Sequence, residues 1–432
     1  MALQLLTDAV FSGVSDIPAR APLPNDALGY ADFTTGGLQI TQTLAQMGAS
    51  ANAVILPSSS PAGFYYGQNG LAFSPSGGSL ARMEFSGDGE ARGLLVQPDY
   101  TQRVTSAHRQ NLAAGSAVGA TVAADGAGPN GWDQFYNVMP TGAGEASLTL
   151  TAGAVTTNAF IYIGFEVSGS GVVQIGARGG DADDYANFDL SSGTVTAGGG
   201  AVAAMRKVPG GSWFCGIRVQ ALTSPNDIGP YAASVASAAT AKLGAAGAAF
   251  RVRAPIVTAG SAGGLPFPSP WGLTTSSDHA YDNIAHSTAM LAADADFSLV
   301  MRLRSGWWPH QISAGIAYFY VSSSRWLEIR CDGNNNFIIN SNLLGVAYTF
   351  GQRWQPSTQY RVGLTRTGSR LTVNLNGERV SLDAPGEVNG ATVRLGKGAN
   401  AATNVWGGHL QRAIFWPPKS DQALDAAVDW HG

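Results

Sequence analysis

Apolar and polar residues alternate with a period of two along much of this chain, most regularly after residue 290. In the clearest run, Phe297, Leu299, Met301 and Leu303 alternate with Ser, Val and Arg. Successive side chains of a strand point to opposite faces of a sheet, so this period predicts a strand with one buried face.

Three further alternating runs follow at 360–364, 371–375 and 380–382. Gly368-Ser369 separates the first two, and Asn376-Gly377, a strong hairpin signal, separates the last two. The pattern predicts an antiparallel meander with one buried face.

Two apolar runs in the middle of the chain are bounded by Gly or Ser, at 185–195 and 213–219. We interpret them as neighbouring strands of a sandwich, with residues 190–193 (Leu-Ser-Ser-Gly) forming the turn after the first. The Ala-rich stretch 231–249 has helical propensity, but Gly244 and Gly247 interrupt it, which favours strand or irregular structure.

The resulting expectation is an all-β chain with two antiparallel, jelly-roll-like β-sandwiches in tandem. The predicted boundaries are a Gly/Ser-rich region at 1–105, a first sandwich at 106–262, a Pro/Gly linker at 263–275 and a second sandwich at 276–432.

Composition narrows the possible functions. Only 12% of the 432 residues are charged and the net charge is −4, which removes the electrostatic basis for nucleic-acid binding. The uncharged stretch 146–165 is broken by Gly and Thr and alternates, so it predicts strands rather than a membrane helix. The N-terminus has no basic region typical of a signal peptide, so synthesis in a cytoplasm is expected. Cys215 and Cys331 lie in apolar runs and are predicted to be buried free thiols.

Two sets of motifs resemble known families. The runs at 185–195 and 213–219, preceded by Ala-Arg-Gly-Leu-Leu-Val-Gln-Pro at 91–98, resemble a phage head-spike or fibre domain. The hairpin at 371–377, the strand at 393–396 and the run at 409–415 resemble a concanavalin A-like (laminin G-type) lectin sandwich, closed by a short helix near Ser420.

This resemblance implies a structural virion protein: a head spike, head fibre or tail fibre of a tailed phage or a phage-derived gene transfer agent. Residues 1–105 would then dock onto other virion proteins, and the chain would form a homo-oligomer without a cofactor. Its sandwiches would attach the particle to host capsular or surface polysaccharide.

Carbohydrate recognition needs aromatic faces for the C–H side of a sugar ring and polar groups for its hydroxyls. Trp307 and Trp308, between Gly306 and Pro309, are predicted to lie in a loop. The alternative for this pair is a cap over the sandwich or a subunit contact. The full set of sugar-binding candidates is Trp307, Trp308, Trp132, Tyr136, Arg330, Asn334 and Asn335. Trp213, Trp326 and Trp416 are predicted to be mostly core residues.

Enzymatic motifs are scarce. The six histidines are scattered, and a glycosidase would need two carboxylates facing one cleft. Asp181, Asp183 and Asp332 are weak candidates for a calcium site, but solvated turns are the favoured interpretation, so no metal is predicted. A capsule-degrading hydrolase or lyase and a ligand-free spacer remain the alternatives to a binding protein.

Overall fold

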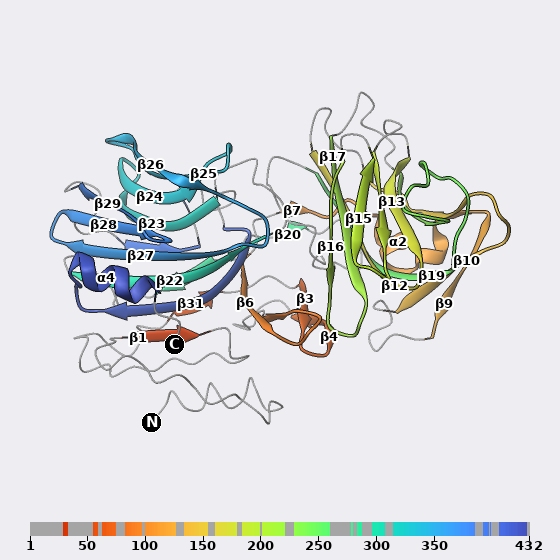
Figure 1. Cartoon of the computed structure of the whole chain (residues 1–432), viewed down its shortest axis with the longest axis horizontal. Coiled ribbons are helices and arrows are strands. Elements are labelled where there is room, and N and C mark those ends of the chain that lie inside the picture. Colours follow the sequence, from red (N-terminus) through yellow and green to blue (C-terminus); the bar gives the residue numbers. More distant parts are fainter. Residues whose placement is uncertain are drawn as a thin grey trace.

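The chain folds into two antiparallel β-sandwiches that lie side by side (Figure 1). The computed structural model describes residues 29–32, 55–58, 63–74, 83–96, 100–126, 134–153, 160–178, 184–198, 201–220, 229–259, 278–279, 283–286, 296–306, 314–384, 392–396, 398 and 406–429. The expectation of an all-β fold built from sandwiches is confirmed. No helix among these residues is long and apolar enough to span a membrane.

The first sandwich consists of two six-stranded sheets that enclose one apolar core. One sheet has the order β16 (Val202–Lys207), β17 (Trp213–Gln220), β12 (Phe160–Gly169), β19 (Phe250–Ala259), β10 (Phe135–Pro140) and β9 (Ala120–Asp125). The other has the order β15 (Thr194–Gly198), β14 (Tyr185–Asp189), β13 (Val172–Arg178), β18 (Gly229–Val235), β11 (Ala146–Thr149) and β8 (Ser116–Val118). Two short helices, α2 (Ser106–Gln110) and η2 (Leu112–Ala114), precede β8.

The two apolar runs in the middle of the chain are strands, but they do not pair within one sheet. β14 and β17 lie in opposite sheets of the first sandwich. The turn after β14 reaches across to β17: a Cβ added at Gly193 would lie 2.8 Å from Cη2 of Trp213. The two strands are therefore neighbours across the interior of the sandwich and not within one sheet.

The second sandwich packs a five-stranded sheet on a larger one. The larger sheet has the order β29 (Glu378–Asp383), β28 (Arg370–Leu375), β27 (Gln359–Thr367), β22 (Phe297–Ser305), β31 (Gly408–Trp416), β6 (Ala91–Val96) and β5 (Met83–Phe85), and β1 (Gly29–Asp32) also pairs with β31. The smaller sheet has the order β26 (Gly345–Arg353), β25 (Asn336–Ser341), β24 (Arg325–Cys331), β23 (Ala314–Ser322) and β30 (Thr392–Leu395).

The period-two pattern of β22 matches its burial on both faces. Leu299, Met301 and Leu303 are fully buried in the core between the sheets. Val300, on the opposite face, packs under helix α4 (Asp421–Asp429), the helix expected near Ser420. The predicted strand is confirmed. Val300 interrupts the alternation of apolar and polar residues because its side of the sheet is also buried, under α4.

Three other local expectations are confirmed. The Ala-rich stretch 231–249 contains strand β18 followed by turns, and no helix. Asn376 and Gly377, with φ values of 47° and 94°, form the tight turn between β28 and β29. Cys215 and Cys331 are buried free thiols, as predicted.

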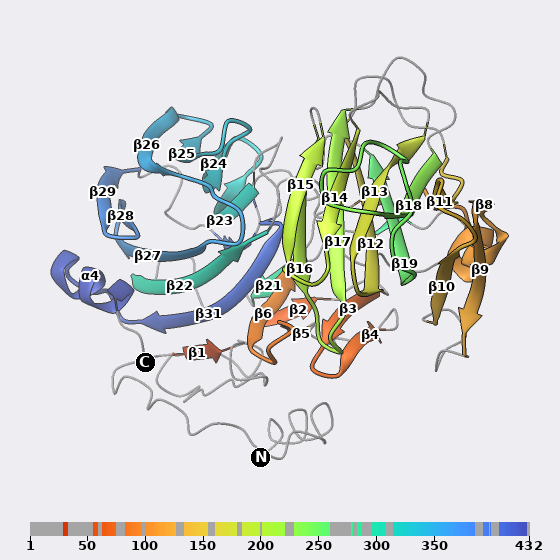
Figure 2. The same ribbon diagram turned by 45° about the vertical axis from the view of Figure 1, so that its right-hand side comes forward.

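Strands from the first hundred residues lie against both sandwiches (Figure 2). β6 pairs with β31 and β5 pairs with β6, so this hairpin extends the larger sheet of the second sandwich. The hairpin of β3 (Gly63–Gly67) and β4 (Gly70–Ser74) places Tyr66 against Phe214 of the first sandwich. Two short pairings, β2 (Ile55–Ser58) with β21 (Asn283–His286) and β7 (Tyr100–Thr101) with β20 (Asp278–His279), complete the described elements. The boundary at residue 105 and the attachment role of this region remain predictions.

Candidate functional site

The structure describes four of the seven predicted sugar-binding residues: Tyr136, Arg330, Asn334 and Asn335. Trp132, Trp307 and Trp308 lie outside the described residues, as do Asp181 and Asp183. Tyr136 is only 2% exposed on β10, where its ring belongs to the core of the first sandwich. Tyr136 is therefore not a sugar-stacking residue, because its aromatic face is already packed; the prediction for it was wrong.

Asp332 organises the turn between β24 and β25. Its Oδ1 accepts hydrogen bonds from the backbone nitrogens of Asn334 (2.9 Å) and Asn336 (2.8 Å). Asn335 adopts a φ of 65° at the tip. The carboxylate is thus occupied in shaping the turn, and no group of three His, Cys, Asp or Glu side chains suited to a metal occurs in the described parts of the chain.

This turn lies at the same end of the second sandwich as Gly306 and Ala314, the described residues on either side of 307–313. Ala314 pairs with Cys331 at the end of β24. The carbonyl of Gly306 accepts a hydrogen bond from the nitrogen of Ser357 at 2.7 Å, and that of Asn335 accepts one from the nitrogen of Trp354 at 2.9 Å. Gly306, Ala314 and the predicted candidates Asn334 and Asn335 thus lie at one edge of the sandwich.

The outer face of the five-stranded sheet carries a cluster that the sequence did not identify. Residues two apart on a strand share a face, and the register aligns these residues across neighbouring strands. Tyr318 on β23 pairs with Glu328 on β24 and with Arg394 on β30, while Tyr320 pairs with Trp326. We name this set the outer-face cluster: Tyr318, Tyr320, Trp326, Glu328, Arg330 and Arg394.

Three aromatic rings of the outer-face cluster contact one another. The ring centroid of Tyr318 lies 5.8 Å from that of Tyr320 and 6.1 Å from that of Trp326, with tilted planes. Tyr318 is 4% exposed, whereas Tyr320 and Trp326 are half-buried. Trp326 was expected to be a core residue, but it lies on the face opposite to the core residues Leu327 and Ile329.

The charged members surround these rings. Glu328 is fully buried, and its Oε1 lies 2.6 Å from Nη1 of Arg330. Burial, and then the negative charge of Glu328, raise the pKa of Tyr318 to about 12, so its hydroxyl stays protonated at neutral pH. The guanidinium of Arg394 lies 5.5 Å from the ring centroid of Tyr320 and forms no ion pair with a described residue.

This arrangement has the parts of a carbohydrate site: half-buried aromatic rings, a carboxylate–guanidinium pair and a second guanidinium. Arg330 was among the predicted residues; Tyr318, Tyr320, Glu328 and Arg394 were missed. The sequence did contain a sign of this face: Trp326, Glu328 and Arg330 alternate with the apolar residues of the run 326–331 and so share one face of the strand.

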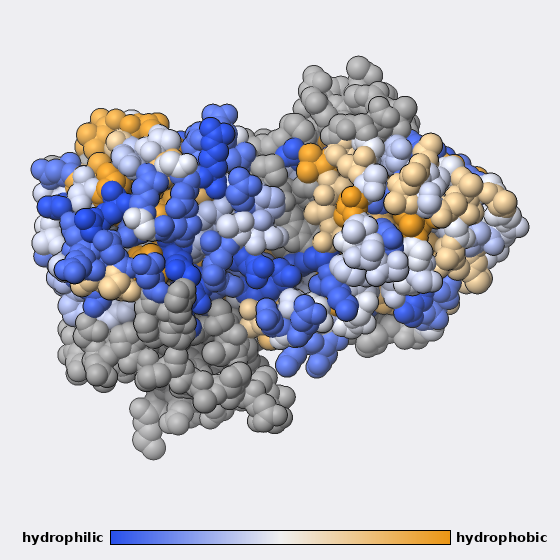
Figure 3. Space-filling view, in the orientation of Figure 1, coloured by the Kyte–Doolittle hydropathy of each residue, from blue (hydrophilic) through white to orange (hydrophobic). Residues whose placement is uncertain are grey.

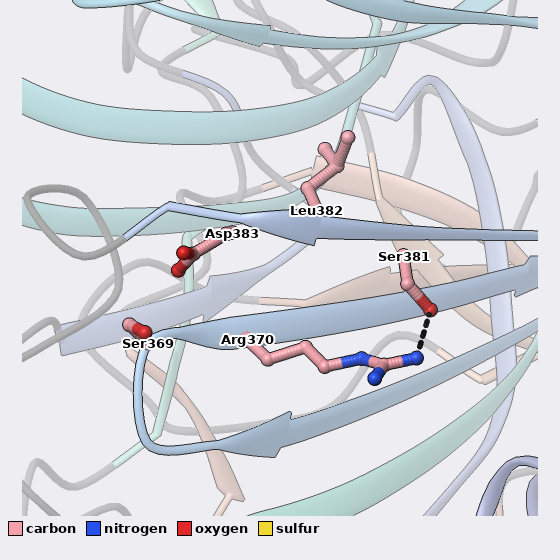
Figure 4. A pocket seen from close by; sticks show the side chains of 5 residues that line it. All are labelled: Ser369, Arg370, Ser381, Leu382 and Asp383. Carbon is pink, nitrogen blue, oxygen red and sulfur yellow. Dashed lines mark hydrogen bonds between the residues drawn. The ribbon is translucent and has the colours of Figure 1, made fainter.

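Two other surfaces of the second sandwich are distinct from this cluster. A pocket of about 360 Å³ lies on the β28–β29 hairpin, where Nη2 of Arg370 donates to Oγ of Ser381 at 3.1 Å (Figure 4). Its lining has no aromatic side chain. An apolar patch lies over β26 (Figure 3), where Leu343, Leu344 and Val346 are at least half-exposed. Neither surface combines an aromatic face with hydrogen-bonding groups.

No protein-family model matches this sequence, and no curated protein matches it. Several solved structures are similar to part of the chain. The CBM40 domain of Ruminococcus gnavus IT-sialidase, solved with α2,3-sialyllactose, is 16% identical over 32% of this chain and 85% of that chain, with a TM-score of 0.26. Leech intramolecular trans-sialidase is 15% identical over 33% of this chain and 24% of that chain, with a TM-score of 0.24. Chicken galectin 2 is 12% identical over 28% of this chain and 92% of that chain, with a TM-score of 0.21.

Proposed function

We propose that this chain is a non-enzymatic, glycan-binding subunit of a particle appendage, and that the outer-face cluster of the second sandwich contacts the sugar. The observation that carries the proposal is the cross-strand arrangement of Trp326, Tyr320 and Arg394 at half-buried positions on one sheet face. Aromatic rings at such positions can stack on sugar C–H faces, and the neighbouring polar groups can pair with hydroxyls.

Charge gives the cluster a preference for one class of glycan. The outer-face cluster contains one carboxylate, that of Glu328, and two guanidiniums, those of Arg330 and Arg394, so its net charge is positive. A guanidinium stacked on an aromatic ring is well suited to bind a carboxylate in a bidentate manner. We therefore expect acidic polysaccharides to bind better than neutral ones.

The particle context rests on the motif resemblance to phage spike and fibre domains. In this proposal the protein is exposed on a virion, other virion proteins hold its N-terminal region, and several copies present the same sugar site. Individually weak sugar contacts then add up, since the effective concentration of a second site near a bound first site is high.

Direct binding measurements test the proposal. The full chain would be passed over immobilised acidic and neutral bacterial polysaccharides. We expect the wild type to bind the acidic ones. Trp326→Ala should weaken binding by roughly 30-fold, because truncating an aromatic anchor typically costs about 2 kcal/mol. Arg394→Gln should lose the preference for acidic polysaccharides.

Arg370→Gln is the matched control, since it removes an exposed guanidinium from the other sheet of the same sandwich. It should bind like the wild type. Absence of wild-type binding to every polysaccharide would favour the spacer alternative. Equal binding by all variants would place the sugar site outside the outer-face cluster. New reducing ends in the polysaccharide would support the hydrolase alternative, and new unsaturated sugar ends would support the lyase.

A further inference from the structure

A buried ionic junction connects the two sandwiches through a residue of the N-terminal region. Glu84 on β5 is fully buried, and Arg206 of β16 in the first sandwich donates to both of its oxygens, at 3.1 and 2.9 Å. His409 of β31 in the second sandwich places Nε2 at 2.6 Å from Oε2 of the same carboxylate. One carboxylate thus bonds to a strand of each sandwich.

The backbone and a second carboxylate reinforce this contact. The nitrogen of Gly87 donates to the carbonyl of Lys207, next to Arg206, at 3.2 Å. Tyr66 of β3 lies under the guanidinium of Arg206, 5.4 Å from ring centroid to Cζ, and its hydroxyl donates to buried Glu166 at 3.1 Å. In Figure 2, β5 and β6 accordingly lie between β31 and β16.

We propose that this junction is an acid-sensitive clasp that fixes the two sandwiches relative to each other at neutral pH and releases them on mild acidification. The proposal does not depend on glycan binding. It rests on a buried histidine and a buried carboxylate at a domain boundary, each bonded across that boundary.

The charges that face His409 determine the direction of the response. They come from Glu84 on β5, Arg92 on β6, Arg206 on β16 and Arg304, the strand neighbour of His409 on β22. Burial lowers the pKa of His409, and hydrogen bonding and attraction to Glu84 offset this only in part. The ring is therefore neutral in the closed junction, where its N–H donates to the ionised carboxylate.

Acidification favours the open form of the junction. When the junction opens, water solvates the ring and its pKa returns toward 6.5, so the open form takes up a proton that the closed form resists. Acidification below about pH 6.5 thus favours opening. For Glu84, burial raises the pKa, but Arg206 and then His409 outweigh burial and lower it overall. The carboxylate therefore adds to the effect in more acidic solution.

The test measures the distance between the sandwiches in the full chain. Cysteines introduced at exposed Ser192 and Ser323 would carry a fluorophore pair, since the native thiols of Cys215 and Cys331 are buried. We expect one short transfer distance at pH 7.5. At pH 5.5 a second, longer distance should appear while circular dichroism shows both sandwiches still folded.

Two variants make the result specific. His409→Gln keeps a hydrogen-bond donor but cannot titrate, so it should shift the opening to lower pH, where Glu84 titrates. Gly87→Ala should open the junction at pH 7.5 as well, because the added Cβ would lie 2.9 Å from the carbonyl carbon of Lys207. Arg251→Gln removes an exposed ion pair with Asp125 within the first sandwich and serves as the control that should match the wild type.

A single unchanged distance from pH 7.5 to 5.0 in the folded wild type would overturn the clasp. So would a His409→Gln variant that opens at the same pH as the wild type, since another group would then be the sensor.

Discussion

At the scale of single residues, two glycines that both have a positive φ differ in what surrounds them. Gly193 and Gly377 have φ values of 72° and 94°, a region that L-residues rarely adopt. An alanine Cβ at Gly377 would meet nothing within 4 Å, whereas at Gly193 it would lie 2.8 Å from the Trp213 ring.

We therefore expect Gly377→Ala to lower the free energy of unfolding by about 1 kcal/mol, through backbone strain alone. Gly193→Ala should cost about 2–3 kcal/mol, because it adds a clash across the first sandwich. Urea denaturation of both variants measures the difference. Equal costs would show that the Trp213 ring moves aside freely.

The outer-face cluster shows how far residues could be assigned from the sequence. The alternation of Leu327, Ile329 and Cys331 matches the residues of that strand that face the core, whereas Trp326, which was predicted to be a core residue, lies on the other face. The alternation could not show that Arg330 and Trp326 share their face with Tyr318 and Arg394, because a period of two identifies a face but not the neighbouring strand. The misassignment of Tyr136 has the same origin, since nothing local distinguishes a buried tyrosine from an exposed one.

At the scale of elements, α4 covers the second buried face of the larger sheet in the second sandwich. Leu424 and Val428 are fully or almost fully buried and pack against Val300, Ile414 and Trp416. The helix lies close to the sheet because Gly363 has no side chain: a Cβ there would be 2.4 Å from Cγ2 of Val428.

Leu424→Ala should therefore reduce the free energy of unfolding by about 2–4 kcal/mol, the cost of a cavity in a packed apolar cluster. Denaturant unfolding followed by tryptophan fluorescence would measure it. Asp429, at the end of the helix, forms an ion pair with Arg361, and its side chain is 72% exposed. Asp429→Ala should therefore change the free energy of unfolding by less than about 0.5 kcal/mol. A Leu424 variant as stable as the wild type would mean that the helix contributes little to the fold.

Elements formed by nearby residues could be predicted, while those formed by distant segments could not. The meander of β27, β28 and β29 was recognisable because two tight turns join its strands. The pairing of β6 with β31 joins residues more than 300 positions apart, such as Leu94 and Leu410, and no local pattern encodes it. The same reason explains why β14 and β17 were expected side by side and lie instead in facing sheets.

At the scale of the whole molecule, the Glu84 junction predicts a large effect from a small change. Glu84→Gln removes the charge that Arg206 and His409 both contact. Disrupting one member of a buried ion pair typically costs about 3–5 kcal/mol, so the variant should unfold at clearly lower urea concentration. A cost below about 1 kcal/mol would indicate that water enters the junction and replaces the carboxylate.

Wild-type stability should also fall on acidification. The pKa values of His409 and Glu84 are both lowered in the folded protein, so the unfolded chain binds more protons, first below pH 6.5 and then below pH 4.5. Urea midpoints at pH 7.5, 6.0 and 5.0 should decrease in that order. His409→Gln should flatten the decrease between pH 7.5 and 6.0, and an equally steep decrease would exclude His409 as its source.

The central claim, that the outer-face cluster binds a glycan, is tested most directly by a crystal structure with a bound acidic oligosaccharide, chosen from the polysaccharide that binds best. We predict a sugar ring stacked on Trp326 or Tyr320, with its acidic group within hydrogen-bonding distance of the Arg394 guanidinium. An oligosaccharide bound elsewhere, for instance in the Arg370 pocket, with the outer-face cluster unoccupied, would contradict the account.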